Sequence, residues 1–134
     1  FPNQVNNSLG FPGILKGALL VRAKKISDGM AIAASYSLAN YAEKRGIHPD
    51  NILPTMDEVG VFPQEARDVA QEAIRENLAR VKISEEEAFS RAERDIKYAR
   101  ELVEVMMSEG FIPPPPESLL QDALDWAIQQ ICKE

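Results

Sequence analysis

The sequence predicts a mainly α-helical chain, and three observations lead to that prediction. Apolar residues recur at helical spacing in successive segments. Glycine, proline and helix-capping residues punctuate the sequence between these segments. Convincing period-two alternation is missing beyond short candidates such as 51–53, so we expect no sheet within this chain.

The first two predicted helices occupy 11–23 and 28–45. The first is apolar and carries Pro12 near its start, where a missing backbone N–H has no helical partner in any case. The second is rich in alanine, and Asp28 can cap its start. Gly46 stands where a left-handed residue commonly ends a helix.

A third helix is predicted over 63–80, and a fourth follows it. The apolar residues of the third share one stripe: Ala66, Val69, Ala70, Ala73, Ile74 and Leu78. The fourth has the strongest start signal, because Ser84 and Glu87 have the spacing of a capping box. Glu87 and Arg91 also have the i,i+4 spacing that supports a helix. Gly110 is expected to end it, at a length of roughly 38 Å.

The last part of the chain is predicted to be a helical extension. Pro113–Pro116 form a stiff polyproline spacer, and an amphipathic helix over 118–132 follows. One side of that helix carries Leu120, Leu124, Ile128 and Ile131. The fourth helix carries a heptad-like seam of Phe89, Ala92, Ile96, Ala99, Val103 and Met106. The seam fits either a contact between subunits or packing on its own domain. Both interpretations favour an oligomer, because five helices without a sheet expose more apolar surface than they can easily bury among themselves.

Composition restricts the possible functions. The chain has 134 residues, 45% of them hydrophobic and 27% charged, which is typical of one soluble globular domain. A formal net charge of -6 argues against a nucleic-acid surface, and no apolar run approaches the roughly 20 residues that cross a bilayer. The single cysteine, Cys132, is expected to be a small buried hydrophobic residue in a reducing compartment, and the cytoplasm is the expected location. His48 is expected to be structural or exposed.

The opening segment contains the residues with the strongest case for binding. It includes the stretch PNQVNNSLGFPGILKGALLVRA, in which Asn6 and Asn7 precede a predicted helix N-terminus that favours an anion. Their side-chain amides can orient a carboxylate or a carboxamide without titrating. The alternative is that they only form a turn and cap the helix. Gly13 and Gly17 lie four residues apart on one helix face, so we expect another backbone to approach closely there.

This opening segment resembles malic enzymes of the bacterial and archaeal type, in the part that follows their nucleotide-binding core. That family has a P-N-Q-x-N-N turn, then G-F-P-G/F-I and a G-A-L-x-V-R-A helix. The resemblance continues through ISDGMAIAASYSLA, NILP and VFPQEARDVAQEAIRENLAR, and so covers about 1–80. No counterpart is matched after Ser84.

The resemblance implies that this chain is the C-terminal part of an enzyme that oxidatively decarboxylates malate to pyruvate and CO2. NAD or NADP would take the hydride, and Mn or Mg would assist. Residues 1–83 would complete an α/β Rossmann-type NAD(P)-binding domain, and 84–134 would form a helical extension. The motif's paired asparagines fall on Asn6 and Asn7. Asn7 is the first choice for the substrate contact and Asn6 for a shared or cofactor contact, although the two roles could be exchanged.

The rest of the family's site is expected outside this chain. The family's general-base lysine, general-acid tyrosine, acidic metal ligands and glycine-rich loop lie upstream of the motif. We therefore assign no catalytic residue and no metal ligand to this chain, and the acidic run at 85–87 is explained by the helix dipole. Other polar residues are expected to be solvated lysines or packing tyrosines: Lys16, Lys24, Lys25, Tyr36 and Tyr41.

The chain alone is expected to be inactive until the N-terminal catalytic portion of the same enzyme completes the site. The other expected partners are malate and pyruvate as ligands and a second copy in a homodimer or higher oligomer, with no nucleic acid and no membrane. A malolactic-type enzyme on the same scaffold and a free-standing helical interaction module are the alternatives. The choice between NAD and NADP depends on a ribose-contacting loop that lies outside the motif.

Overall fold

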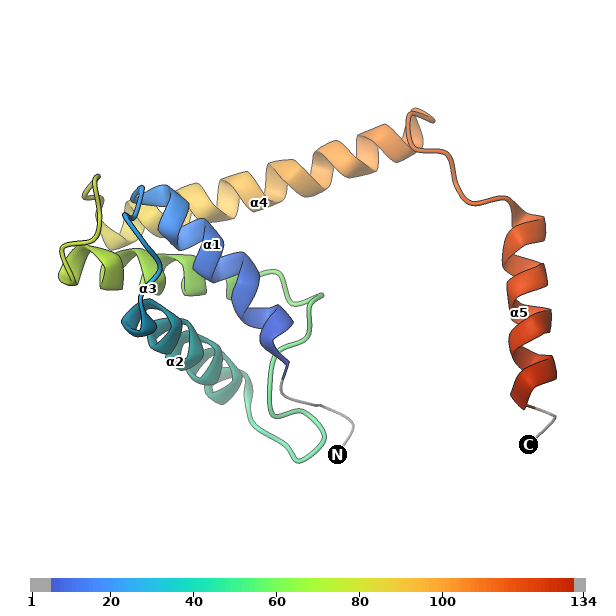
Figure 1. Cartoon of the computed structure of the whole chain (residues 1–134), viewed down its shortest axis with the longest axis horizontal. Coiled ribbons are helices and arrows are strands. Elements are labelled where there is room, and N and C mark those ends of the chain that lie inside the picture. The colour runs from blue at the N-terminus through green and yellow to red at the C-terminus, as the bar shows by residue number, and fades with distance from the viewer. Residues whose placement is uncertain (1–5, 132–134) are drawn as a thin grey trace. The chain divides into compact units, whose positions relative to one another are not determined.

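The structure of the protein, a computed structural model, describes residues 6–131 (Figure 1). These residues form helices and no strand, which confirms the mainly α-helical fold; the isolated bridge His48–Asn51 lies where the sequence allowed a short strand. Residues 1–5 and Cys132, with the expectations that fall on them, lie outside the described part. The elements are the short 3-10 helix η1 (Asn7–Leu9), α1 (Gly10–Leu20), α2 (Asp28–Arg45), α3 (Val61–Arg75), α4 (Glu85–Ser108) and α5 (Glu117–Ile131).

The chain divides into two compact units, 1–98 and 99–134, and each is described by itself. In the first unit α3 packs against both α1 and α2 (Figure 1). The expected domain boundary after residue 83 falls inside this unit, because the first turns of α4 join its core. None of the helices over 6–131 combines the length and the apolar character that crossing a bilayer requires.

The core of the first unit is built around the apolar stripe of α3. From α4, Ala88 and Ala92 complete it, and both are fully buried. Because alanines line so many of these contacts, the helices pack closely, and small increases in side-chain volume are costly. The predicted stripe joins this core in full, with four buried members and two at the edge: Ala66, Val69, Ala70, Ala73, Ile74 and Leu78.

Helix α2 has the predicted bounds, but its N-cap is the preceding residue. The Ser27 hydroxyl accepts a hydrogen bond from the Met30 N–H at 3.2 Å, so the expectation that Asp28 caps the helix was wrong. Asp28 instead lies in the first turn, where the helix dipole favours a carboxylate. Gly46 follows the helix with a φ of 99°, which confirms the predicted glycine stop.

Helix α1 ends at Leu20, three residues before its predicted end. The end has the hydrogen bonds of a Schellman motif, because the Arg22 N–H donates to the Leu19 carbonyl at 3.1 Å and the Ala23 N–H donates to the Ala18 carbonyl at 2.9 Å. The carbonyl of the buried Val21 accepts hydrogen bonds from the N–H groups of Arg80 at 2.9 Å and Val81 at 3.1 Å. Arg22 then takes a left-handed φ of 49°, which turns the chain away from the helix axis.

Helix α3 begins two residues earlier and ends five residues earlier than predicted. Its start accommodates Pro63, because the N–H groups of the first turn have no helical partner. At its end, Asn77 takes a left-handed φ of 58°, and the Leu78 N–H closes back on the Ala73 carbonyl at 2.9 Å. Asparagine adopts this conformation more readily than most residues, so Asn77 is a stop signal that the periodicity alone did not reveal.

Arg45 holds the loop between α2 and α3. Its guanidinium donates to the Asn51 side-chain oxygen at 2.6 Å and to the Leu53 carbonyl at 3.2 Å, and it pairs with the Glu58 carboxylate. Burial would raise the pKa of Glu58, but hydrogen bonds from the Thr55 N–H and from Arg45 outweigh burial and lower that pKa. An irregular segment is thereby fixed to the end of α2.

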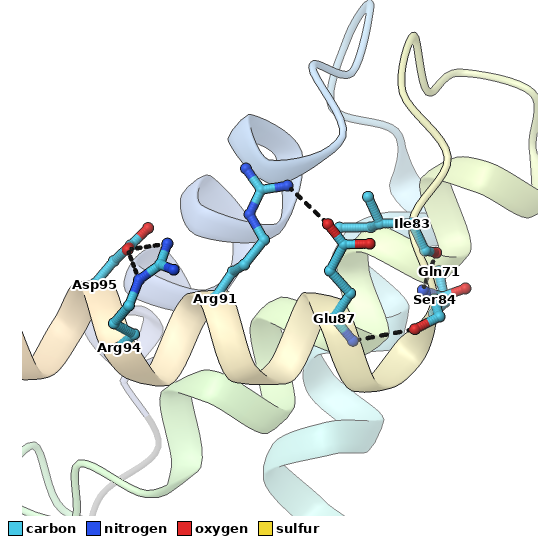
Figure 2. A network of polar contacts seen from close by, with 7 residues as sticks. All are labelled: Gln71, Ile83, Ser84, Glu87, Arg91, Arg94 and Asp95. Carbon is cyan, nitrogen blue, oxygen red and sulfur yellow. Dashed lines mark hydrogen bonds and ion pairs between the residues drawn. The ribbon is translucent and has the colours of Figure 1, made fainter.

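The start of α4 confirms Ser84 as its cap, as Figure 2 shows. The Ser84 hydroxyl accepts a hydrogen bond from the Glu87 N–H at 3.1 Å. The Glu87 carboxylate points along the helix to Arg91, at 3.4 Å, and so forms the predicted i,i+4 pair. The Gln71 side chain ties α3 to this start by donating to the Ile83 carbonyl at 3.2 Å.

The predicted seam of α4 behaves differently along its length. In the first unit Ala92 is buried and Phe89 and Ile96 are half-buried, so this part packs on its own unit. Within the second unit the seam residue Val103 is 48% exposed, and Gly110, with a φ of 77°, follows the helix end as predicted. The apolar side of α5 is also exposed, at 49% to 75%, along Leu120, Leu124, Ile128 and Ile131.

Candidate functional site

The asparagine turn lies at the start of η1, immediately before α1. Asn6 is the N-cap of η1, and its side-chain oxygen accepts a hydrogen bond from the Ser8 N–H at 2.9 Å. The helix-cap interpretation therefore holds for Asn6. A carboxamide whose oxygen caps a turn still carries an NH2 group, which can donate to a ligand.

Asn7 and its neighbours combine exposed polar side chains with a buried anchor. Asn6, Asn7 and Ser8 are exposed, whereas Leu9 is only 5% exposed and packs in a cluster with Val61 and Phe62 at the start of α3. Because Leu9 is fixed in this cluster, the backbone that carries Asn7 is fixed with it. The turn thus presents two carboxamides to the outside from a position held by the core.

The close approach of another backbone is confirmed at Gly17, where α3 is the partner, whereas at Gly13 a side chain of α3 approaches instead. A Cβ atom at Gly17 would lie 2.6 Å from the Ala66 carbonyl oxygen and 2.7 Å from the Val69 Cβ. A Cβ atom at Gly13 would collide with the carboxyl group of Glu65. The two glycines therefore let α1, the helix that follows the asparagine turn, lie directly on α3.

Glu65 is the buried residue that the sequence prediction missed. Its side chain has 0% exposure, and neither carboxylate oxygen has a hydrogen-bond partner of good geometry within the described residues. Burial raises the pKa of Glu65 to about 8, and the Gly13 N–H opposes that shift only in part. The available signal was spacing, since Glu65 precedes Val69 and Ala73 by four and eight residues on the apolar stripe.

The lysines divide between paired and exposed positions. The Lys16 ammonium lies 2.5 Å from the Asp95 carboxylate and joins α1 to α4, so the expectation of a solvated Lys16 was wrong. Lys16 lowers the pKa of Asp95, and Arg94, at 3.1 Å from the same carboxylate, adds to the effect (Figure 2). Lys24 and Lys25 are exposed as expected.

The two tyrosines of α2 have different surroundings. Tyr41 packs against the cluster of Leu9, Val61 and Phe62, which confirms its expected packing role. Tyr36 is 67% exposed, so the same expectation was wrong for it. An alanine-rich helix gave no sequence signal to distinguish the two, because α2 has only a weak apolar stripe.

The described residues do not fit a metal site. Over 6–131 no three His, Cys, Asp or Glu side chains lie together in a metal-binding arrangement. Glu85, Glu86 and Glu87 occupy the first turn of α4, as expected. A hard divalent cation needs several converging oxygens, and the acidic side chains of this part of the chain do not supply them.

A hollow of about 520 Å³ lies between α2, α3 and the start of α4, and neither Asn6 nor Asn7 lines it. It is lined by Tyr36 and by several charged side chains. Its cations are already paired, since Arg67 lies 2.8 Å from Asp68 and Arg75 pairs with Glu72. The hollow therefore offers no free positive charge to an anionic substrate.

The class of protein follows from comparison with known families. Residues 1–77 match the family described as the NAD-binding domain of malic enzyme. The chain therefore belongs to the malic enzyme family. The asparagine turn and the contact between α1 and α3 both lie within the matched residues, 1–77.

Individual relatives agree with this assignment. The chain is 38% identical over 94 residues to the bifunctional malic/malolactic enzyme of Bacillus subtilis. This alignment covers 70% of this chain and 23% of that protein. The crystal structure of Entamoeba histolytica malic enzyme matches 98% of this chain and 27% of its own, at 55% identity and a TM-score of 0.91. That of the Pyrococcus horikoshii malic enzyme matches 79% of this chain and 24% of its own, at 40% identity and a TM-score of 0.72. The chain thus spans about a quarter of the length of these relatives.

Proposed function

We propose that this chain forms the C-terminal helical part of a Rossmann-type NAD(P)-binding domain, in an enzyme that converts malate to pyruvate and CO2. Family membership supports the proposal, and so does the likeness to two malic enzyme structures over most of the chain. The observation that carries it is the turn at Asn6 and Asn7. Two exposed carboxamides stand there on a backbone anchored by Leu9.

The asparagines bind and orient in this proposal, and they do not exchange protons. In the reaction C2 of malate is oxidised, the bond to one carboxyl group breaks, and CO2 leaves. NAD or NADP supplies the hydride acceptor. Asn7 donates an amide N–H to a malate carboxylate so that the C2–H bond points at the nicotinamide. A misplacement of about 1 Å can cost about a hundredfold in rate, so this orientation has a large effect on catalysis.

Asn6 has the more restricted role of the pair. Its oxygen caps the turn, and its NH2 group is left to donate towards the cofactor or to a group shared with malate. The structure of the turn therefore favours Asn7 for the substrate contact, since its side chain is exposed and does not form the cap.

The remaining parts of the site belong to the N-terminal catalytic portion in this proposal. That portion supplies the lysine base, the tyrosine acid, the glycine-rich loop and the ligands of Mn or Mg. We further propose that the enzyme works in the cytoplasm as a homodimer or higher oligomer. The exposed apolar sides of α4 and α5 within the second unit support a protein contact there.

A malolactic enzyme is the second candidate, because the relative from Bacillus subtilis is named as a bifunctional malic/malolactic enzyme. The two activities differ in their products. Incubation of the full-length enzyme with malate and NAD(P) gives pyruvate and reduced cofactor in the first case. Lactate without net cofactor reduction indicates the second. The helical interaction module is disfavoured by family membership.

The proposal is tested by replacing Asn7 with Ala in the full-length enzyme. We expect kcat/KM for malate to fall about ten- to a hundredfold, because malate loses its orienting contact. The melting temperature should change little, since Asn7 is exposed. Asn40→Ala, an exposed asparagine on α2, is the matched control and should keep the wild-type kinetics. Unchanged kinetics for Asn7→Ala would remove Asn7 from the site.

A further inference from the structure

Glu65 is the one acidic side chain among the described residues that is completely buried. It lies on α3 and faces the first turn of α1, which directly follows the asparagine turn. Burial of an acid without hydrogen-bond partners is rare and costly, and such a residue in a native protein calls for a functional explanation. By contrast, Glu58, Glu72 and Asp95 of this unit each pair with a basic side chain.

The geometry shows what Glu65 contacts. Gly13 has no side chain on the face towards α3, and the Glu65 carboxyl group occupies the space that a Cβ atom there would need. A Cβ atom at Gly10 would lie 3.7 Å from a Glu65 oxygen, which is an ordinary contact distance. The carboxyl group therefore fills the gap between α3 and the start of α1.

The surrounding charges leave Glu65 without a counter-ion. On α1 the cation is Lys16, and its ammonium is paired with Asp95 of α4. On α3 the nearest charged residues along the helix, Arg67 and Asp68, pair with each other. From α2, Tyr41 is the titratable residue that packs at the start of α3. A buried acid in such surroundings stays protonated near neutral pH, and the raised pKa of Glu65 agrees.

We propose that Glu65 is a positioning residue, whose buried carboxyl group fixes the first turn of α1 and through it the turn that carries Asn6 and Asn7. This inference rests on the proposed function of the two asparagines. Only a short stretch of chain separates Glu65's contact on α1 from the asparagine turn, because Gly10, the first residue of α1, follows η1 directly. Leu9, the last residue of η1, is also held by the cluster at the start of α3.

Ionisation is predicted to loosen this contact in alkaline solution. The unfolded chain loses the Glu65 proton near pH 4.5, whereas the folded chain holds it to about pH 8. The stabilising contribution is therefore complete below pH 4.5, decreases as the pH rises to about 8, and is lost above it. If only the neutral form holds the asparagine turn, the competent fraction falls roughly tenfold for each pH unit above 8.

The experiment compares Glu65→Gln with wild-type full-length enzyme between pH 6 and 9.5. Glutamine keeps the size of the side chain and cannot ionise. We expect wild type to lose melting temperature relative to Glu65→Gln as the pH rises. We also expect the KM for malate of wild type to increase above pH 8, and the increase to be absent in Glu65→Gln. Glu72→Gln is the matched control on the same helix and should follow wild type, because Glu72 pairs with Arg75.

A second pair of variants keeps the test decisive if Glu65→Gln folds poorly. Gly13→Ala places a methyl group against the Glu65 carboxyl group and should raise the KM for malate. Adding Glu65→Ala to it removes the collision and should restore KM in part. Identical pH dependence of melting temperature and KM in wild type and Glu65→Gln, or no restoration in the double variant, would overturn the inference. A wild-type enzyme that does not oxidise malate would instead overturn the proposed function, while the melting series still tests Glu65.

Discussion

Single residues on α1 decide how closely α3 can approach, and they make a direct prediction possible. Gly17→Ala should lower the free energy of unfolding by about 1–3 kcal/mol, because the added methyl group meets the Ala66 backbone oxygen, which cannot rotate away. Gly10→Ala is the matched control. Its Cβ atom would meet only the Ile14 side chain at 3.5 Å and Glu65 at 3.7 Å. Urea unfolding of the full-length enzyme measures both, and equal stability of the two variants would contradict the close-contact account.

Among single residues, the asparagine turn could be predicted from the sequence, and the burial of Glu65 could not. The turn at Asn6 and Asn7 was predicted from the sequence, because a polar pair before a helix is a local pattern; its role in binding stays a prediction. Glu65 was missed, because a glutamate on an apolar stripe is normally assumed to reach solvent. Its burial depends on the absence of a side chain at Gly13, more than fifty residues earlier in the chain. No local pattern contains that information.

At the scale of elements, the start of α4 depends on one hydroxyl group. Ser84→Ala removes the acceptor for the Glu87 N–H and should destabilise the protein by about 1 kcal/mol. Ser90→Ala, at an exposed position within the same helix, is the control and should have a smaller effect. Circular dichroism during thermal unfolding is a suitable measurement. Equal melting temperatures for the two variants would show that the cap contributes nothing.

The helix ends divide in an informative way between local and distant causes. α2 has its predicted bounds, because Ser27 and Gly46 at its ends act through their own backbone neighbours. α1 ends early where Arg22, a residue that gives no stop signal, takes a left-handed φ, and the Val21 carbonyl there accepts hydrogen bonds from the N–H groups of Arg80 and Val81. The first kind of end can be predicted from sequence, and the second requires the packing of α1 on the segment after α3.

At the scale of the whole molecule, the apolar side of α5 makes a prediction about assembly. Leu124 is 54% exposed within the second unit, and a row of exposed apolar residues such as this is typical of a surface that binds another protein chain. Leu124→Glu in the full-length enzyme should shift size-exclusion elution towards smaller species. Gln129→Glu adds the same charge at an exposed position without removing an apolar group, and should elute as wild type. If Leu124→Glu also elutes as wild type, this side of α5 takes no part in the proposed oligomer.

The sequence by itself determined the helices, most of their caps and the asparagine turn, and its opening motif was sufficient to indicate the malic enzyme family. These features depend on residues within a few positions of one another, where backbone hydrogen bonding and periodicity dominate. The tertiary structure alone decided that Glu65 lies buried against α1, that Lys16 pairs with Asp95 and that Tyr36 is exposed. Each of those outcomes depends on how closely distant helices pack, and that distance is fixed by side-chain volumes on both partners together.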